Sequence, residues 1–245
     1  MRLLVTRPEP DATALKAHLI AQGHEVLIEP LLTVEFDTSD PIDLDGVQAL
    51  IATSRNGLRS LAQSRAIDGA RGLPVFCVGP GTASTAKAIG LANVIQGPKS
   101  ARELAALIGA RAEINGGPLL HLAGDSLTPG FTDELQRLGF HVLQPIVYTT
   151  RAATRLSSAI VAHMRNGRID GVVLLSPRTS AVYVRLVARH KLEAACRKLT
   201  HYCLSAAVAA ALGSLEVART AIAAQPNLQE LLALTAAGAA QSAKP

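Results

Sequence analysis

The sequence contains no tryptophan, and aromatic residues make up only 3% of its 245 residues. A protein that stacks bases or sugar rings on an aromatic platform is therefore not expected. Charged residues are also scarce, at 18%, whereas apolar residues reach 49%. This composition excludes a disordered polyelectrolyte and provides enough material for a buried core. The length corresponds to one large domain or two small ones.

Cysteine is rare as well, and Cys77, Cys196 and Cys203 form no C-x-x-C pair and no metal-ligand spacing. An odd cysteine count favours reduced thiols. The N-terminal segment reaches charge and proline by residue 7, which is too early for the core of a signal peptide. The longest Ala-rich apolar run, residues 206–212, is too short to cross a membrane. We expect a cytoplasmic protein without membrane contact.

Motifs for nucleotides, metals and serine nucleophiles are missing. The segment Gly79-Pro80-Gly81 lacks the third glycine of G-x-G-x-x-G, and neither a Walker A motif nor a G-x-S-x-G elbow occurs. The seven histidines are scattered without H-x-x-x-H spacing. The net charge of +5 has no concentrated block, so it suits a small acidic ligand better than nucleic acid, although ordinary solubility charge explains it equally well.

Short apolar strands alternate with amphipathic helices along the chain. Residues 3–5 form a buried strand, residues 11–21 a helix that ends at Gly23, and residues 25–28 the next strand. This alternation is typical of βαβ units and predicts an α/β fold with a parallel sheet.

The chain also contains an internal repeat. The stretch that starts at Leu3 (LLVTRPEPDATALKAHLIAQGHEVLIEPLLTV) resembles one that starts at Leu119 (LLHLAGDSLTPGFTDELQRLGFHVLQPIVYTT). Three further pairs follow in the same order, starting at Gln48 and Asp170, Val75 and Tyr202, and Gly97 and Ala224. An alternative explanation is that any two α/β stretches look alike when Ala and Leu are abundant. Four ordered matches with Gly and Pro in register nevertheless favour a duplicated unit, and hence two similar lobes.

Two extended segments, 32–36 and 146–149, each follow a strand and a proline, and no helix directly precedes them. They are predicted to pair as a two-stranded ribbon between the lobes. One lobe is then discontinuous, with residues 1–31 and 150–245, and the other comprises residues 37–145. A simple head-to-tail pair of domains also fits the sequence.

Small hydroxyl residues, glycines and arginines follow the predicted strands, where ligands bind in open parallel sheets. Each such loop precedes a helix, whose unpaired N–H groups attract anions. Capping alone explains any single Ser or Thr, but the set together suggests a polyanion site. The candidate substrate-binding residues are Arg7, Ser54, Arg55, Gly79, Thr82, Ser176, Arg178 and Ser205.

Other polar residues have simpler predicted roles. Tyr148 lies in the connecting segment, where its phenol acts either as a weak general acid or as a packing group. We expect Tyr183 to be half-buried, His24 to lie at the surface, and Asp125 to cap a helix that begins near Thr128. Residues 236–245 are predicted to form a frayed tail.

The ordered set of segments resembles the uroporphyrinogen-III synthase family over residues 2–235. The segments are LLVTRPEP (3–10), TSRNGL (53–58), PVFCVGPGTASTAKAIG (74–90), LLHLAGD (119–125), LGFHVLQPIVYTT (138–150), IDGVVLLSPRTS (169–180) and CLSAAVAAAL (203–212). The resemblance implies two α/β lobes joined by a ribbon, with hydroxymethylbilane, a linear tetrapyrrole with several carboxylates, bound in the cleft between them. It also implies a monomer that uses no cofactor and no metal.

The implied reaction is loss of water from ring A of hydroxymethylbilane, attack by ring D, and closure with ring D inverted, which gives uroporphyrinogen III. In this resemblance Tyr148 matches the tyrosine proposed to assist departure of the hydroxyl group, and Ser54, Thr82 and Ser176 match loop residues that face the cleft. Many relatives have Gly-Pro-x-Thr where this chain has residues 205–208 (SAAV). Two alternatives remain: a bilobed polyanion binder without enzymatic activity, and a nucleotide-dependent α/β enzyme.

Overall fold

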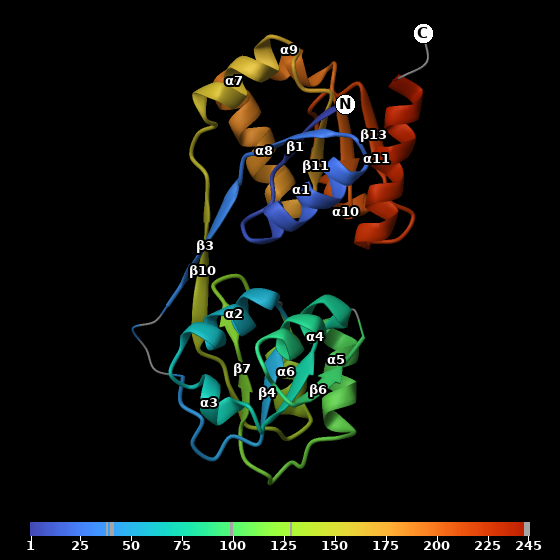
Figure 1. The fold of residues 1–245 in the computed structure, drawn as a ribbon. Helices are drawn as coiled ribbons and strands as arrows, with labels where there is room; N and C mark the ends of the chain where they lie inside the picture. The colour runs from blue at the N-terminus through green and yellow to red at the C-terminus, as the bar shows by residue number, and fades with distance from the viewer. Residues whose placement is uncertain (38, 40–41, 99, 128, 243–245) are drawn as a thin grey trace. The chain divides into compact units, whose positions relative to one another are not determined.

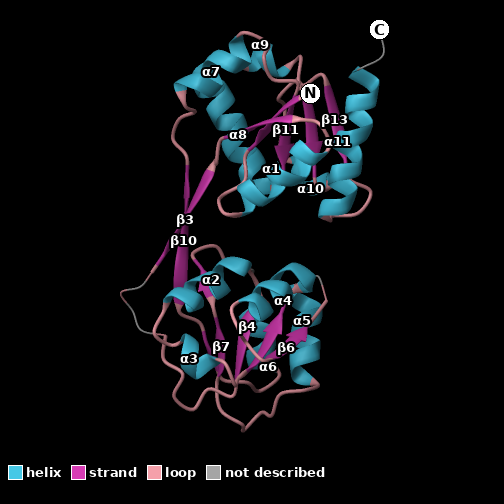
Figure 2. Ribbon diagram, in the orientation of Figure 1, coloured by secondary structure: helices cyan, strands magenta, loops and turns pink. Residues whose placement is uncertain are grey.

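The computed structural model describes residues 1–37, 39, 42–98, 100–127 and 129–242 (Figure 1). The chain divides into two compact units. Lobe 1 comprises Met1–Thr33 with Arg151–Pro245, and lobe 2 comprises Val34–Thr150. Each lobe contains a sheet with helices on both faces (Figure 2).

The sheet of lobe 1 is parallel throughout. Its strands, in spatial order, are β13 (Arg219–Ile222), β12 (Thr200–Cys203), β11 (Gly171–Leu174), β1 (Arg2–Val5) and β2 (Glu25–Ile28). The helices are α1 (Asp11–Ala21), α7 (Ser158–Arg165), α8 (Pro177–His190), α9 (Glu193–Cys196), α10 (Ala206–Ala210) and α11 (Leu228–Ser242). Strand residues alternate between faces, so Leu4 packs under α7–α10 while Leu3 and Val5 pack under α1 and α11.

Lobe 2 is built in the same way, again with parallel strands. In spatial order these are β6 (Asn93–Gln96), β5 (Pro74–Cys77), β4 (Ala49–Ala52), β7 (Leu119–His121) and β9 (Val142–Leu143). Helices α2 (Arg55–Gln63), α3 (Ile67–Ala70) and α4 (Gly79–Ala88) pack on one face. Helices α5 (Ala101–Gly109) and α6 (Phe131–Arg137) pack on the other.

The two sheets have the same strand order once corresponding strands are matched. Strands β11, β12 and β13 correspond to β4, β5 and β6, and strands β1 and β2 correspond to β7 and β9. The internal repeat predicts these pairs except β6 with β13, which end just before its fourth pair of segments begins. The α/β class and the duplicated unit are thereby confirmed.

The chain passes between the lobes in β3 (Leu32–Phe36) and β10 (Ile146–Ala152), which are neighbours in one sheet. Hydrogen bonds from Ala153 N to Leu31 O (2.9 Å) and from Asp37 N to Val147 O (3.0 Å) show that the two strands run in opposite directions. Strand β8 (Ala123–Gly124) pairs with β10 as a third strand, in parallel. The ribbon is thus anchored to lobe 2 by an additional strand that the sequence does not indicate.

Three expectations about single residues and the tail are wrong. His24 is buried, at 4% exposure, where the chain turns from α1 into β2 and its backbone N–H donates to Leu19 O. Tyr183 is fully buried rather than half-buried. The helix α11 continues to Ser242, so most of the predicted tail is helical, and residues 243–245 lie outside the described part. No helix in the described part of the chain combines the length and apolarity needed to cross a bilayer.

Candidate functional site

Each sheet has a topological switch point, where connections leave in opposite directions. In lobe 1 the chain moves from β1 to β2 on one side and from β11 to β12 on the other, so the switch point lies between β1 and β11. In lobe 2 it lies between β4 and β7 for the same reason. Ligands of open α/β sheets bind outside the carboxyl ends of the strands at such points. A ligand is therefore expected at the loops that follow these four strands.

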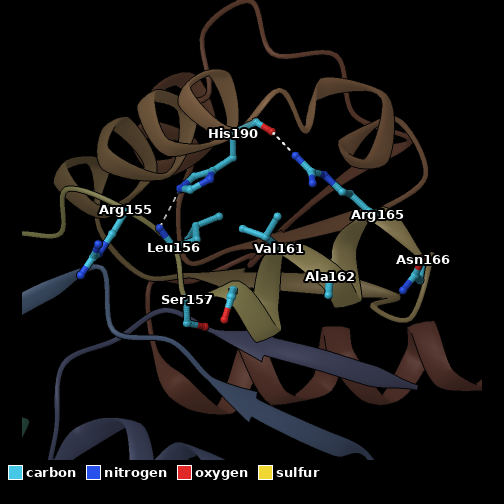
Figure 3. Close-up of a pocket in the computed structure, with 9 residues that line it drawn as sticks. Arg155, Leu156, Ser157, Val161, Ala162, Arg165, Asn166 and His190 are labelled. Atoms are coloured by element: carbon cyan, nitrogen blue, oxygen red, sulfur yellow. Dashed lines mark hydrogen bonds between the residues drawn. The ribbon is translucent and has the colours of Figure 1, made fainter.

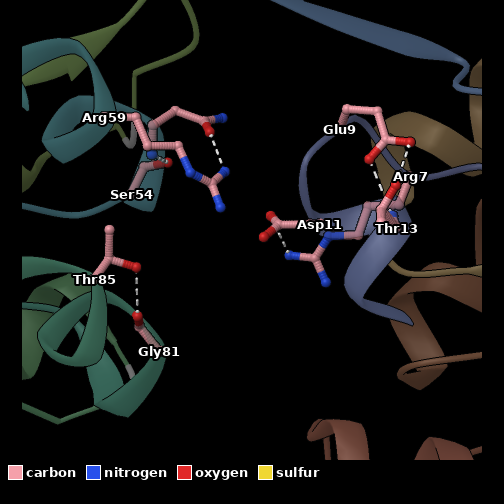
Figure 4. Close-up of polar contacts among 9 residues, drawn as sticks. Arg7, Glu9, Asp11, Thr13, Ser54, Arg59, Gly81 and Thr85 are labelled. Atoms are coloured by element: carbon pink, nitrogen blue, oxygen red, sulfur yellow. Dashed lines mark hydrogen bonds and ion pairs between the residues drawn. The ribbon is translucent and has the colours of Figure 1, made fainter. Parts of the chain in front are cut away.

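At the switch point of lobe 1, Thr6 ties the end of β1 to β11. Its hydroxyl donates to Val173 O at 2.8 Å, and the residue is 1% exposed. The next residue, Arg7, forms an ion pair with Asp11 in the first turn of α1, with 3.0 Å between Nη2 and Oδ2 (Figure 4). Both side chains are partly exposed, so the pair contributes little to stability. It does hold the guanidinium at the carboxyl edge of the sheet.

Two predicted serines in lobe 1 begin helices. Ser176 Oγ accepts a hydrogen bond from Thr179 N (3.1 Å) at the start of α8. Ser205 Oγ accepts one from Val208 N (3.4 Å) at the start of α10. Arg178 lies in the first turn of α8 and is exposed. The capping interpretation is thus correct for both serines, and their caps place the helix starts beside β11 and β12.

At residues 205–208, where the sequence differs from the pattern that the resemblance implies, the structure buries one side chain. Val208, at the position where the resemblance implies a threonine, is 1% exposed and packs into the core of lobe 1. A side chain at this position is therefore used for packing. The backbone amides at the start of α10 remain as the polar groups of this loop.

In lobe 2, Ser54 caps α2 by accepting from Asn56 N at 3.2 Å, and Arg55 is the first residue of the helix. Asn56 Oδ1 accepts from Arg59 Nη1 at 2.9 Å (Figure 4). Gly57 allows α2 to lie close to the switch point, because a Cβ there would be 2.4 Å from Leu122 O.

The predicted residues Gly79 and Thr82 both belong to α4. Gly79 has a φ of +67°, which favours glycine, and its N–H donates to Pro98 O at 3.0 Å. Helix α4 starts without a side-chain cap, unlike α2. Thr82 is 7% exposed, and one turn further on Thr85 Oγ1 donates to Gly81 O at 3.0 Å (Figure 4). The start of α4 therefore offers backbone amides at the end of β5.

Sequence reasoning places Thr53 in a strand-end loop but misses its two partners at the carboxyl edge of the lobe 2 sheet, His121 after β7 and Gln144 after β9. His121 is 3% exposed, and burial lowers its pKa to about 4, so the ring is neutral. Its Nδ1 lies 2.8 Å from Gln144 Nε2, and its Nε2 lies 2.9 Å from Thr53 Oγ1. Because the amide donates to Nδ1, Nε2 carries the hydrogen and donates to Thr53. The Thr53 hydroxyl is thereby oriented with its own hydrogen directed away from the histidine.

Tyr148 is half-buried in β10 and packs beside one core of lobe 2. Asp125, predicted to cap a helix, instead bonds to β10: its N–H donates to Tyr148 O, and its Oδ1 accepts from Thr150 N, both at 3.1 Å. Helix α6 begins at Phe131 with Gly130 as its N-cap residue, and Thr128 lies outside the described residues. The cap prediction for Asp125 is therefore wrong.

A hollow of about 990 Å³ in lobe 1 lies apart from the predicted residues (Figure 3). Leu156 N donates to His190 Nε2 (3.0 Å), and Arg165 Nη2 donates to His190 O (3.2 Å) across it. None of the residues predicted for the site lines this hollow. Its lining residues are Arg155, Leu156, Ser157, Ser158, Val161, Ala162, Arg165, Asn166 and His190.

The described part of the chain contains no group of three or more His, Cys, Asp or Glu side chains placed to hold a metal ion. The cysteines are buried thiols. Burial raises the pKa of Cys77 to about 12 and that of Cys196 and Cys203 to about 11, so none is an activated nucleophile.

The helix cap at the start of α8 leads to a stability prediction. Ser176→Ala removes the acceptor for Thr179 N and is expected to lower the free energy of unfolding by about 1 kcal/mol. Urea unfolding followed by circular dichroism measures the change. Ser84→Ala, at an exposed position inside α4, is the control and is expected to change it little. An unchanged midpoint for Ser176→Ala would contradict the capping role.

Comparison with protein families identifies the chain. A family model described as uroporphyrinogen-III synthase HemD matches residues 13–233, which is most of the sequence. The chain belongs to the uroporphyrinogen-III synthase family. Uroporphyrinogen-III synthases are lyases of porphyrin and haem biosynthesis that cyclise hydroxymethylbilane, so the activity implied by the sequence resemblance is confirmed. The two alternative functions are accordingly set aside.

Solved uroporphyrinogen-III synthases share the fold. The enzyme from Helicobacter pylori aligns with a TM-score of 0.66 over 100% of both chains at 16% identity. A mutant enzyme from the extremely thermophilic bacterium Thermus thermophilus aligns with a TM-score of 0.56 over 99% of this chain and 98% of its own, at 15% identity. A comparison with curated protein sequences gave no significant match. At such identities these structures support the fold, while the family match carries the function.

Proposed function

We propose that this uroporphyrinogen-III synthase holds hydroxymethylbilane through strand-end loops contributed by both lobes, while water leaves and the ring closes. The observation that supports this proposal is that each lobe presents arginines and helix starts at its own switch point. In lobe 1 these are Arg7 and the start of α8 at Ser176. In lobe 2 they are Arg55 and the start of α2 at Ser54.

The chemistry of these loops fits a substrate with many carboxylates. Helix starts carry unpaired N–H groups and partial positive charge, and each binds a carboxylate without a metal. Arginine adds charge-assisted hydrogen bonds, which are stronger than neutral ones. In this proposal Gly79 and Thr82 at α4, and Arg178 and Ser205 in lobe 1, contribute further amides, charge and hydroxyl groups.

Selectivity is the main physical demand on the enzyme. Hydroxymethylbilane closes spontaneously to the symmetric isomer I, so the enzyme must bring the substituted carbon of ring D to ring A first. Fixing a flexible chain in one reactive conformation lowers the barrier by proximity and orientation. This requirement is met by many weak donors rather than by one strong acid or base.

Tyr148 is proposed to assist the first step. Its phenol donates a proton to the departing hydroxyl group, the carbon–oxygen bond breaks, and water leaves an electrophilic ring A. The phenolate then recovers the proton that ring D releases when it regains aromaticity. The tyrosine therefore ends each turnover in its starting state.

Product analysis tests the proposal. The protein is mixed with freshly prepared hydroxymethylbilane, the product is oxidised, and the isomers are separated by chromatography. Isomer III is expected with the active protein, and isomer I with heat-denatured protein or buffer. Isomer I alone from the folded protein would contradict the function. We further propose that the enzyme is a monomer, as the family resemblance implies, and that it is cytoplasmic, as its odd number of cysteines suggests. Size-exclusion chromatography with light scattering tests the oligomeric state.

A further inference from the structure

We infer that Gly124 is a positioning residue for the reaction: the lack of a side chain at this position determines where the phenol of Tyr148 lies. The inference rests on the proposed role of Tyr148 in hydroxyl departure. Gly124 ends β8, the short strand that pairs with β10, and the ladder places it opposite Tyr148.

The ring of Tyr148 occupies the space that a side chain at residue 124 would need. A Cβ on Gly124 would lie 2.4 Å from Cζ, 2.6 Å from Cε2 and 2.7 Å from the phenol oxygen of Tyr148. Carbon atoms in contact are normally about 3.5–4.0 Å apart. All three close atoms belong to the hydroxyl-bearing end of the ring. Any residue other than glycine must therefore displace the group that is proposed to donate the proton.

The backbone beneath the ring is fixed on both sides, so it cannot absorb the displacement. Val147 O accepts from the buried hydroxyl of Ser60 at 2.7 Å. Tyr148 O accepts from Asp125 N at 3.1 Å, and Thr150 N donates to the Asp125 carboxylate at 3.1 Å. A collision at residue 124 is consequently relieved by rotation of the tyrosine side chain.

This rotation affects the chemical step more than substrate binding. The loops proposed to hold the carboxylates lie at the ends of other strands, at Arg7, Ser54 and Ser176. A displacement of a catalytic group by about 1 Å can cost up to about 100-fold in rate. The effect is therefore expected mainly in kcat, with KM nearly unchanged.

The test compares Gly124→Ala, Tyr148→Ala and the double variant with the wild-type enzyme, using initial rates of uroporphyrinogen III formation. Gly124→Ala is expected to lower kcat at least about 10-fold and to change KM less than about twofold. In the Tyr148→Ala background, where no ring is left to displace, Gly124→Ala is expected to change kcat less than about twofold. Gly72→Ala is the matched control, because a Cβ there meets no atom within 4 Å.

The measurements distinguish failure of the positioning inference from failure of the proposed role of Tyr148. An unchanged kcat in Gly124→Ala, or the same loss in both backgrounds, overturns the inference. If Gly124→Ala fails to fold, the inference requires that the double variant, which lacks the tyrosine ring, does fold. If neither variant folds, the inference is overturned. Tyr148→Phe measured in parallel isolates the proposed function: a full rate there refutes the role of Tyr148 itself. A slow Tyr148→Phe with a normal Gly124→Ala refutes only the positioning role.

Discussion

Tyr148→Phe is expected to lower kcat about 100-fold, the lower end of the usual contribution of a general acid, and to leave KM within about twofold. The substitution removes only the phenol oxygen, and the remaining ring still packs against Gly124 and the core of lobe 2. Substrate carboxylates bind elsewhere in the proposal, so affinity is preserved. Single-turnover measurements with hydroxymethylbilane separate the chemical step from product release.

The competing spontaneous reaction provides a second readout for this variant. As the enzymatic step slows, more substrate closes in solution, so the isomer I fraction is expected to rise as enzyme concentration falls. Tyr202→Phe is the matched control, because Tyr202 is a buried tyrosine in the core of lobe 1. Its turnover and isomer ratio are expected to match those of the wild type. If Tyr148→Phe also matches the wild type, Tyr148 has only a packing role.

The duplicated α/β architecture follows from the sequence because it depends on local patterns. Apolar strands, helix-ending glycines and strand-end serines recur in order, and the matched pair Ser54 and Ser176 caps the equivalent helices α2 and α8. Both caps depend on hydrogen bonds within three residues. Such contacts join residues that are close in the sequence, so a repeated sequence pattern produces a repeated structure.

Features that depend on contacts between distant segments could not be predicted in this way. His121 bonds to Thr53, 68 positions away, and Asp125 bonds to Thr150, 25 positions away. A lone histidine at a strand end has no pattern that separates a buried hydrogen-bonding group from a surface residue. Gly124 likewise has the sequence context of an ordinary loop glycine, and only the pairing of β8 with β10 places it opposite Tyr148. The candidate site is thus predictable as a set of loops, but its side-chain geometry is not.

Acid is expected to destabilise both lobes through buried histidines, and one histidine in each lobe has a strongly lowered pKa. His121 in lobe 2 and His201 in lobe 1 are at most 3% exposed, and burial lowers the pKa of each from 6.5 to about 4. His201 Nε2 lies 3.0 Å from the hydroxyl of Tyr183, which in turn lies 3.2 Å from Cys196 Sγ. Both rings are therefore held in the neutral form by hydrogen-bonded, buried surroundings.

The direction in which pH changes the free energy of unfolding follows from the number of protons that each state binds. Between pH 6.5 and about 4 the unfolded chain binds a proton at each of these histidines and the folded chain does not. The free energy of unfolding therefore falls as the pH falls through this window. The slope approaches about 1.4 kcal/mol per pH unit for each histidine, which amounts to about 3 kcal/mol each by pH 4. Above pH 6.5 these two groups make stability nearly independent of pH.

Urea unfolding at about pH 7.5 and pH 4.5 measures the loss. Carboxylates also titrate in acid, so the histidine contribution is isolated by comparing the pH-dependent loss of each variant with that of the wild type. His121→Gln and His201→Gln are each expected to reduce this loss by about 2–3 kcal/mol, even though each variant is less stable at neutral pH. His141→Gln, at an exposed position, is the control and is expected to leave the loss unchanged. If the two buried-site variants lose as much stability in acid as the wild type, the neutral histidines are not the cause of the acid sensitivity.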